Sequence, residues 1–146
     1  MGLKRTQADI WFSRCVRERA NWVCELCKTV HPDAQATGRS RALHCSHFIG
    51  RGNWSVRFDA FNAFCHCYAC HVRFGSDKYL QEQHYAAVFF VTLFVFLKER
   101  KQDTKLGRFA RKSQKEITKH YKNEYNIMRD LRAKGRTGRI EFENWI

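Results

Sequence analysis

Two Cys-x-x-Cys pairs constrain this chain more than any other feature of its sequence. Cys24 and Cys27 form the first pair, Cys67 and Cys70 form the second, and residues 28–66 separate them. Each pair presents two thiolates from one tight turn, and two such turns complete a tetrahedron around zinc. The sequence therefore predicts a structural Zn²⁺ held by these four cysteines. Three neighbouring residues are alternatives for one of the ligands: Cys45, Cys65 and His66.

The remaining pattern predicts an α+β protein with small elements around the zinc. We expect a helix over residues 6–20, a strand over 43–48, a short second strand over 56–58 and a helix from 76 or 77 to about 101. Ser113 and Glu116 stand at capping-box spacing before a further helix, which Gly135 is placed to end. We expect an N-terminal helix and zinc-stapled core over residues 1–78, and a basic helical extension over residues 79–146.

Strand alternation divides the side chains of residues 43–48 between two faces. Leu43, Cys45 and His47 share one face of the expected strand, and the three residues between and after them share the other: His44, Ser46 and Phe48.

The charge of the chain points to a polyanionic partner. It has 27 Lys and Arg against 14 Asp and Glu, a net charge of +13 and a pI near 9.8. Nucleic acid is the commonest polyanion that such a surface attracts. A hydrophobic content of 44% excludes a disordered basic tail. Residues 98–139 hold much of the positive charge, so we interpret them as a phosphate-binding arm, with a merely solvated helix face as the alternative.

No segment predicts membrane insertion. The first residues lack the apolar stretch of a signal peptide, and the apolar run over 85–97 is shorter than the roughly 20 residues that cross a bilayer. We therefore expect a cytoplasmic protein. Because residues 86–97 are apolar on every helical face, they need cover all round. A homodimer interface and packing against the first and last helices of the same chain are both possible sources of that cover.

Three further residues have the types and order of a catalytic site. His47 lies near the end of the expected strand, Asn62 lies between the cysteine pairs, and His71 directly follows the second pair. One interpretation is that a strand and a helix are clasped so that His47 faces a metal ion held partly by His71. Alone, His47 would be interpreted as a structural histidine, but its spacing to Asn62 and His71 favours a catalytic role.

In this layout, CxxC…SHF…RF…N…CxxCH, the chain resembles the HNH endonucleases, the ββα-metal fold in its zinc-ribbon form. Within that group it more closely resembles the phage NinG/Rap recombination nucleases. The resemblance covers roughly residues 8–134, and these stretches carry it: 15–20, 43–49, 56–62, 67–71 and 75–77.

The resemblance implies metal-assisted hydrolysis of DNA phosphodiester bonds. His47 would be the general base that deprotonates the attacking water, and Asn62 would hold the loop and orient His47. His71 would bind a catalytic Mg²⁺ or Mn²⁺. Many HNH motifs place Asp or His directly before the base, whereas this chain has Ser46, a weak ligand for a hard cation. Three residues are candidates for completing the metal shell: His44, Asp59 and Asp77.

Basic residues flank the expected site in sequence. If the fold is right, four of them would contact DNA phosphates: Arg51, Arg57, Arg73 and Lys78. Trp54 could stack on bases, although core packing is the favoured interpretation of this residue.

The resemblance favours a structure-selective endonuclease that cuts branched DNA, such as a Holliday junction, during phage recombination in the cytoplasm of a bacterial host. Branched DNA suits a homodimer, because two related active sites can address two strands. One alternative is an HNH nicking or packaging-associated nuclease without branch preference. The other is a non-catalytic zinc-ribbon DNA-binding module, with Ser46 as the sign of a lost active site.

Overall fold

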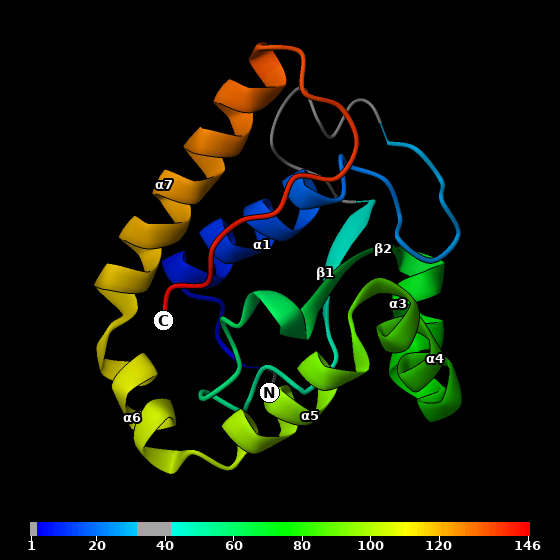
Figure 1. The fold of residues 1–146 in the computed structure, drawn as a ribbon. Coiled ribbons are helices and arrows are strands. Elements are labelled where there is room, and N and C mark those ends of the chain that lie inside the picture. The colour runs from blue at the N-terminus through cyan, green and yellow to red at the C-terminus, as the bar shows by residue number, and fades with distance from the viewer. Residues whose placement is uncertain (1–2, 32–41) are drawn as a thin grey trace.

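A computed structural model describes residues 3–31 and 42–146 of the chain. Within them the fold is α+β, as predicted, with six α-helices, one 3₁₀ helix and a two-stranded antiparallel sheet (Figure 1). The elements are, in chain order, α1 (Gln7–Arg19), β1 (Leu43–His47), η1 (Ala60–Asn62), β2 (Ala63–Cys67), α3 (Tyr68–Ser76), α4 (Lys78–Val88), α5 (Val91–Lys101), α6 (Thr104–Lys112) and α7 (Gln114–Ala133).

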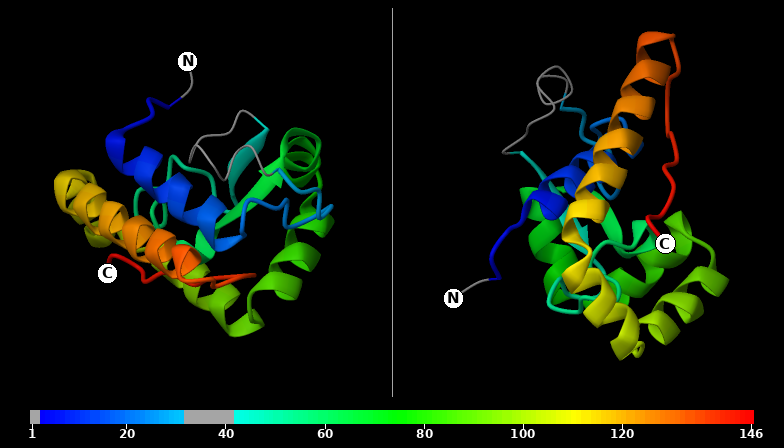
Figure 2. Two further views of the ribbon diagram at one scale, coloured as in Figure 1. Left: turned by 90° about the horizontal axis from the view of Figure 1, so that it is seen from above. Right: turned by 90° about the vertical axis from the view of Figure 1, so that its left-hand side faces the viewer.

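The first helix begins where the sequence predicts. The Thr6 hydroxyl accepts a hydrogen bond from the Asp9 backbone N–H, and the Asp9 carboxylate accepts one from the Thr6 N–H, which completes a capping box. The helix α1 lies beside α7 in all the views (Figures 1 and 2). Buried side chains from both helices join the main core, including Phe12, Val16, Ile117 and Tyr121. Sequence-distant helices therefore share one core.

The helix α7 confirms its predicted end but not its predicted capping box. Ser113 is the N-cap residue, yet its side chain makes no capping hydrogen bond. At the other end, Gly135 adopts a φ of +94°, which costs a glycine little. The Gly135 N–H bonds to the Arg132 carbonyl at 2.9 Å and the Arg136 N–H bonds to the Leu131 carbonyl at 3.0 Å, as in a Schellman motif.

The sheet confirms the predicted first strand and corrects the second. Strand β1 pairs with β2 so that Leu43 lies opposite Cys67 and His47 lies opposite Ala63. Residues 56–58, predicted as a strand, instead lie in turns, in which the Val56 N–H bonds to the Asn53 carbonyl and the Asp59 N–H bonds to the Val56 carbonyl. These i to i+3 bonds use the backbone groups that a strand would need.

The predicted long helix is two helices. The predicted helix is interrupted at Phe89 and Phe90, which separate α4 from α5, and the two helices meet at a bend of 119°. Phe89 is buried in a second core cluster, where its ring packs on Phe61 and Tyr85. Neither glycine nor proline lies at the break, so the packing of Phe89 overrides the helical propensity of the run.

Much of the apolar surface of α5 stays exposed among the described residues. Leu97 is buried, but several of its neighbours expose half or more of their surface: Phe90, Val91, Val95 and Phe96. Packing against the first and last helices therefore does not supply the cover that the sequence demands.

After α7 the chain returns along that helix as an extended segment (Figure 2). Ile140 and Phe142 are buried in the main core, and the Ile140 N–H bonds to the Arg19 carbonyl at 3.2 Å. The Asn144 side chain accepts hydrogen bonds from the Ala60 N–H and the Tyr121 hydroxyl. This segment, for which the sequence suggests no element, seals the core between α1, η1 and α7.

Among the described residues, no single helix has the length and apolar content to cross a membrane. The bent pair α4 and α5 meets both conditions only when the two helices are taken together.

Candidate functional site

The four predicted zinc ligands converge on one point. The sulfur atoms of Cys24, Cys27, Cys67 and Cys70 all lie within 4.8 Å of one another. The Cys27 and Cys67 sulfurs are 3.8 Å apart, which matches the edge of roughly 3.8 Å expected for a tetrahedron with Zn–S bonds of about 2.3 Å. The residues present therefore fit a zinc ion in number, chemistry and spacing.

Local backbone geometry forms each cysteine turn. In the first, the Cys24 N–H bonds to the Thr29 carbonyl, the Lys28 N–H bonds to the Cys24 carbonyl, and Lys28 adopts a φ of +64°. In the second, Cys67 is the N-cap residue of α3 and Cys70 lies in its first turn. Hydrogen bonds from Thr29 lower the pKa of the Cys27 thiol to about 6, which favours the thiolate that a metal ion binds.

Glu25 joins the first cysteine turn to the sheet. Its N–H bonds to the Cys65 carbonyl at 2.8 Å, and its carboxylate accepts a hydrogen bond from the Cys65 N–H at 2.7 Å. Arg139 from the C-terminal segment forms an ion pair with the same carboxylate at 2.6 Å. The alternative ligands Cys45, Cys65 and His66 lie outside the four-cysteine cluster.

A second group of polar side chains lies between β1 and α3. The Ser46 hydroxyl is 2.6 Å from Nδ1 of His71, and the rings of His44 and His71 stack with centroids 5.0 Å apart. Burial lowers the pKa of both histidines, and for His44 the neighbouring His71 lowers it further. Neutral imidazoles are the form that binds a metal ion. Of the three candidates for completing the shell around His71, only His44 lies beside it.

His47 lies on the other face of β1. Its ring packs 5.9 Å from that of Phe12 of α1, and its Nε2 is 3.0 Å from the Arg57 carbonyl oxygen. Because a carbonyl only accepts, Nε2 carries the proton and Nδ1 keeps the lone pair of a base. Burial lowers the pKa of His47 to about 4, so the ring is neutral at pH 7.

The structure does not bring His47 and His71 together as the sequence-based interpretation requires. His71 contacts His44 and Ser46, on one face of β1, whereas His47 points from the opposite face towards α1. The reason is the two-residue alternation of the strand, which separates consecutive side chains. The expected clasp of one metal ion between His47 and His71 is therefore wrong for this arrangement.

Asn62 holds the loop after β1, as expected. Its side chain accepts a hydrogen bond from the Ile49 N–H at 2.7 Å and donates to the carbonyls of Ile49 and Val56, both at 2.9 Å. Its side chain is fully buried and makes its bonds with the loop rather than with His47. Asn62 therefore positions the loop and does not face a ligand.

Asp59 and Asp77 have other partners. The Asp59 carboxylate is buried, caps η1 through the Phe61 N–H and lies 3.0 Å from Arg100. Asp77 accepts a hydrogen bond from the Leu80 N–H and caps α4, beyond the end of α3. Neither joins a group of three or more potential metal ligands; among the described residues the four cysteines form the only such group.

Of the four predicted phosphate contacts, the prediction for Arg57 is wrong, because this side chain is buried. Only 1% of Arg57 is exposed, and its guanidinium forms an ion pair with Asp9 at 2.6 Å. Arg73 and Lys78 are exposed on α3 and α4, and Arg51 donates to the Leu3 carbonyl. Arg73 and Lys78 therefore keep the surface position that a phosphate contact requires.

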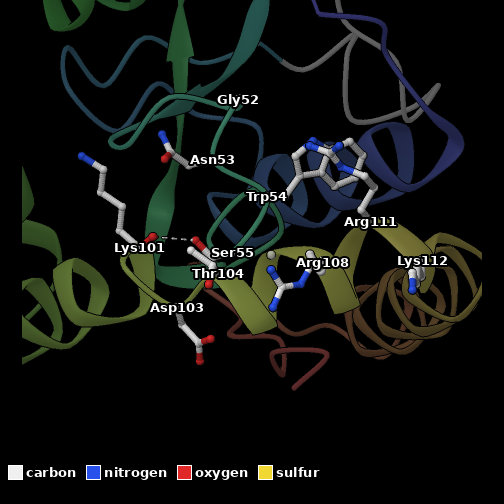
Figure 3. A pocket seen from close by; sticks show the side chains of 11 residues that line it. Gly52, Asn53, Trp54, Ser55, Lys101, Asp103, Thr104, Arg108, Arg111 and Lys112 are labelled. Atoms are coloured by element: carbon white, nitrogen blue, oxygen red, sulfur yellow. Dashed lines mark hydrogen bonds between the residues drawn. The ribbon is translucent and has the colours of Figure 1, made fainter.

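Trp54 has a role that the sequence did not indicate. It packs beside Phe58, as a core residue would, but it also lies under the guanidinium groups of Arg57 and Arg111 at 4.2 and 5.2 Å. It lines a pocket of about 350 Å³ between the 52–55 loop and α6 (Figure 3). The charge of residues 98–139 was the one sequence signal for this pocket.

Comparisons with protein-family models, with curated proteins and with solved structures found no match to this chain. Its function is therefore argued from its own residues.

Proposed function

We propose that the chain is a metal-dependent DNA endonuclease of the HNH type, with a zinc ion on its four cysteines. The observation that carries the proposal is the contact between β1 and α3, where Ser46 and His71 meet at 2.6 Å beside His44. This group supplies two imidazoles and a hydroxyl near the four-cysteine cluster, and the net charge of +13 attracts DNA.

The chemistry divides between the two faces of β1. His71 and His44 are the candidate ligands for Mg²⁺ or Mn²⁺, which would stabilise charge on the phosphate. His47 is the candidate base, since its Nε2 donates to the Arg57 carbonyl and its neutral ring keeps a lone pair on Nδ1.

We propose branched DNA, such as the junctions of phage recombination in a bacterial host, as the substrate, and a homodimer as the acting form. The exposed apolar face of α5 supports the dimer, because a second copy would cover Phe90, Val91, Val95 and Phe96. Two active sites related by a two-fold axis suit a junction with paired strands.

The test is cleavage of four-way junctions, nicked duplex and linear duplex with Mg²⁺ or Mn²⁺. His47→Ala should lower the cleavage rate by about 10²- to 10⁴-fold, the usual contribution of a general base. His71→Ala should raise the metal concentration needed for cleavage. His120→Ala is the matched control, because His120 lies on α7 and bonds to the Glu143 carbonyl, away from β1. Equal cleavage of linear and branched DNA would remove the branch preference but leave the nuclease.

One observation favours a second candidate, a zinc-stapled DNA-binding module without catalysis. The described residues place no carboxylate with His44 and His71, and Ser46 is a weak ligand for a hard cation. Binding of junction DNA without cleavage at any metal concentration would establish the module and overturn the endonuclease.

A further inference from the structure

The pocket between the 52–55 loop and α6 is surrounded by cations. Lys101, Arg108, Arg111 and Lys112 line it, against one carboxylate, that of Asp103 (Figure 3). All four cations are exposed. The pocket therefore presents a concentrated positive charge to the solvent.

That charge is not neutralised within the described part of the chain. None of these four cations forms an ion pair there, in contrast to Arg57, Arg100 and Arg139. The Asp103 carboxylate accepts a hydrogen bond from the Leu106 N–H at 2.9 Å and so serves as the cap of α6. Unpaired cations grouped around a concave surface are an expected feature of a polyanion-binding site.

The pocket is also held in shape by specific contacts. The Ser55 hydroxyl donates to the Lys101 carbonyl at 3.1 Å, which ties the loop to the end of α5. Gly107 lets α6 approach this loop closely, since a Cβ there would lie 3.4 Å from the Ser55 backbone nitrogen. The Arg111 guanidinium lies 5.2 Å from the Trp54 ring centroid, a cation–π contact that limits its freedom.

The pocket is connected to His47 through Arg57. The Arg57 carbonyl accepts the hydrogen bond of His47, and the Arg57 guanidinium lies 4.2 Å from the centre of the Trp54 ring. Asp9 fixes that guanidinium from the other side. One buried residue thus positions both the candidate base and the wall of the pocket.

We propose that this pocket binds consecutive phosphate groups of a DNA strand and so guides the strand past the end of β1. The inference rests on the proposed function, because it assigns the DNA-binding surface of that same site. Arginine side chains suit this role, since the planar guanidinium donates two parallel hydrogen bonds to phosphate oxygens.

The test is the salt dependence of DNA binding. Affinity for a fluorescent four-way junction is measured by anisotropy across a series of NaCl concentrations, without added divalent cation. The triple variant Arg108→Gln, Arg111→Gln, Lys112→Gln should lower the slope of log K against log[salt] by about two to three, since each lost phosphate contact removes about 0.9. Unchanged thermal midpoints check that the exposed substitutions leave the fold intact.

A matched triple variant makes the result specific. Lys105→Gln, Lys115→Gln, Lys119→Gln removes the same charge from exposed positions of α6 and α7 that do not line the pocket. Its slope should stay close to that of the unmodified chain. Equal weakening by both triple variants, or an unchanged slope in the pocket variant, would overturn the inference.

The two proposals fail separately. Binding that depends on the pocket, in a chain that never cleaves DNA, would keep the inference and reject the nuclease. Cleavage that depends on His47, with an unchanged slope in the pocket variant, would keep the nuclease and reject the pocket.

Discussion

At the scale of single residues, a buried histidine pair makes stability depend on pH. Nε2 of His66 lies 3.0 Å from Nε2 of His84, and neither side chain is more than 6% exposed. Burial and the neighbouring His84 lower the pKa of His66 to about 3. In the unfolded chain this pKa is near 6.5. Between these values the unfolded chain binds a proton that the folded chain rejects, so the free energy of unfolding falls as the pH falls.

The variant His66→Leu should weaken that dependence. Each such histidine contributes up to about 1.4 kcal/mol per pH unit well below pH 6.5. Between pH 5.5 and 4.5, urea unfolding of the variant should show a slope smaller by about that amount. Parallel slopes for the two chains would mean that His66 does not carry the effect.

Residue types and spacing predicted some positions well and others poorly. The cysteines were predictable because metal ligands need a fixed chemistry at a fixed local spacing, and the Cys-x-x-Cys turns supply both. Arg57 was not, because nothing in its local sequence shows that Asp9, far away in the chain, would pair with it in the core. Likewise, strand alternation correctly placed His44 and Ser46 on one face of β1. It could not show that this face meets α3 and the opposite face meets α1, because those contacts depend on tertiary packing.

At the scale of elements, the four cysteines should decide whether β2, α3 and the 23–30 turn hold together. Cys67→Ser should lower the zinc content from about one ion per chain and reduce the free energy of unfolding by several kcal/mol. The reason is that in small zinc domains about 10 kcal/mol or more of metal-binding energy is folding energy. Mass spectrometry of the metal content and urea unfolding measure the two effects.

Cys45→Ser is the matched control, because Cys45 lies on β1 outside the cluster. It should keep one zinc ion per chain. A purified chain without zinc, or equal zinc loss in both variants, would contradict the four-cysteine site.

Element boundaries were predictable where the signal is local. Helix α1 begins within the expected range, and the left-handed Gly135 ends α7 as expected. The break at Phe89 was not predictable, because the run is apolar on every face and only the second core selects which phenylalanine turns inward. The second strand was missed for a similar reason: residues 63–66 are all buried, on both faces of the sheet, so the strand lacks the alternation of apolar and polar side chains.

At the scale of the whole molecule, the exposed face of α5 predicts self-association. Phe90 is 78% exposed and Val91 is 66% exposed, and Phe94 at the same helix lines an apolar pocket of about 230 Å³ with Tyr85. A contiguous apolar surface of this kind is unfavourable in water and is typical of an interface.

If two copies pair through this surface, a charged side chain introduced into it must lose its water without gaining a partner. Val95→Glu should therefore shift the chain from dimer to monomer in sedimentation velocity, with an unchanged circular dichroism spectrum. Ile127→Glu on α7, where the side chain is 46% exposed and away from α5, should leave the dimer intact. A monomer for the unmodified chain at micromolar concentration would reject the pairing.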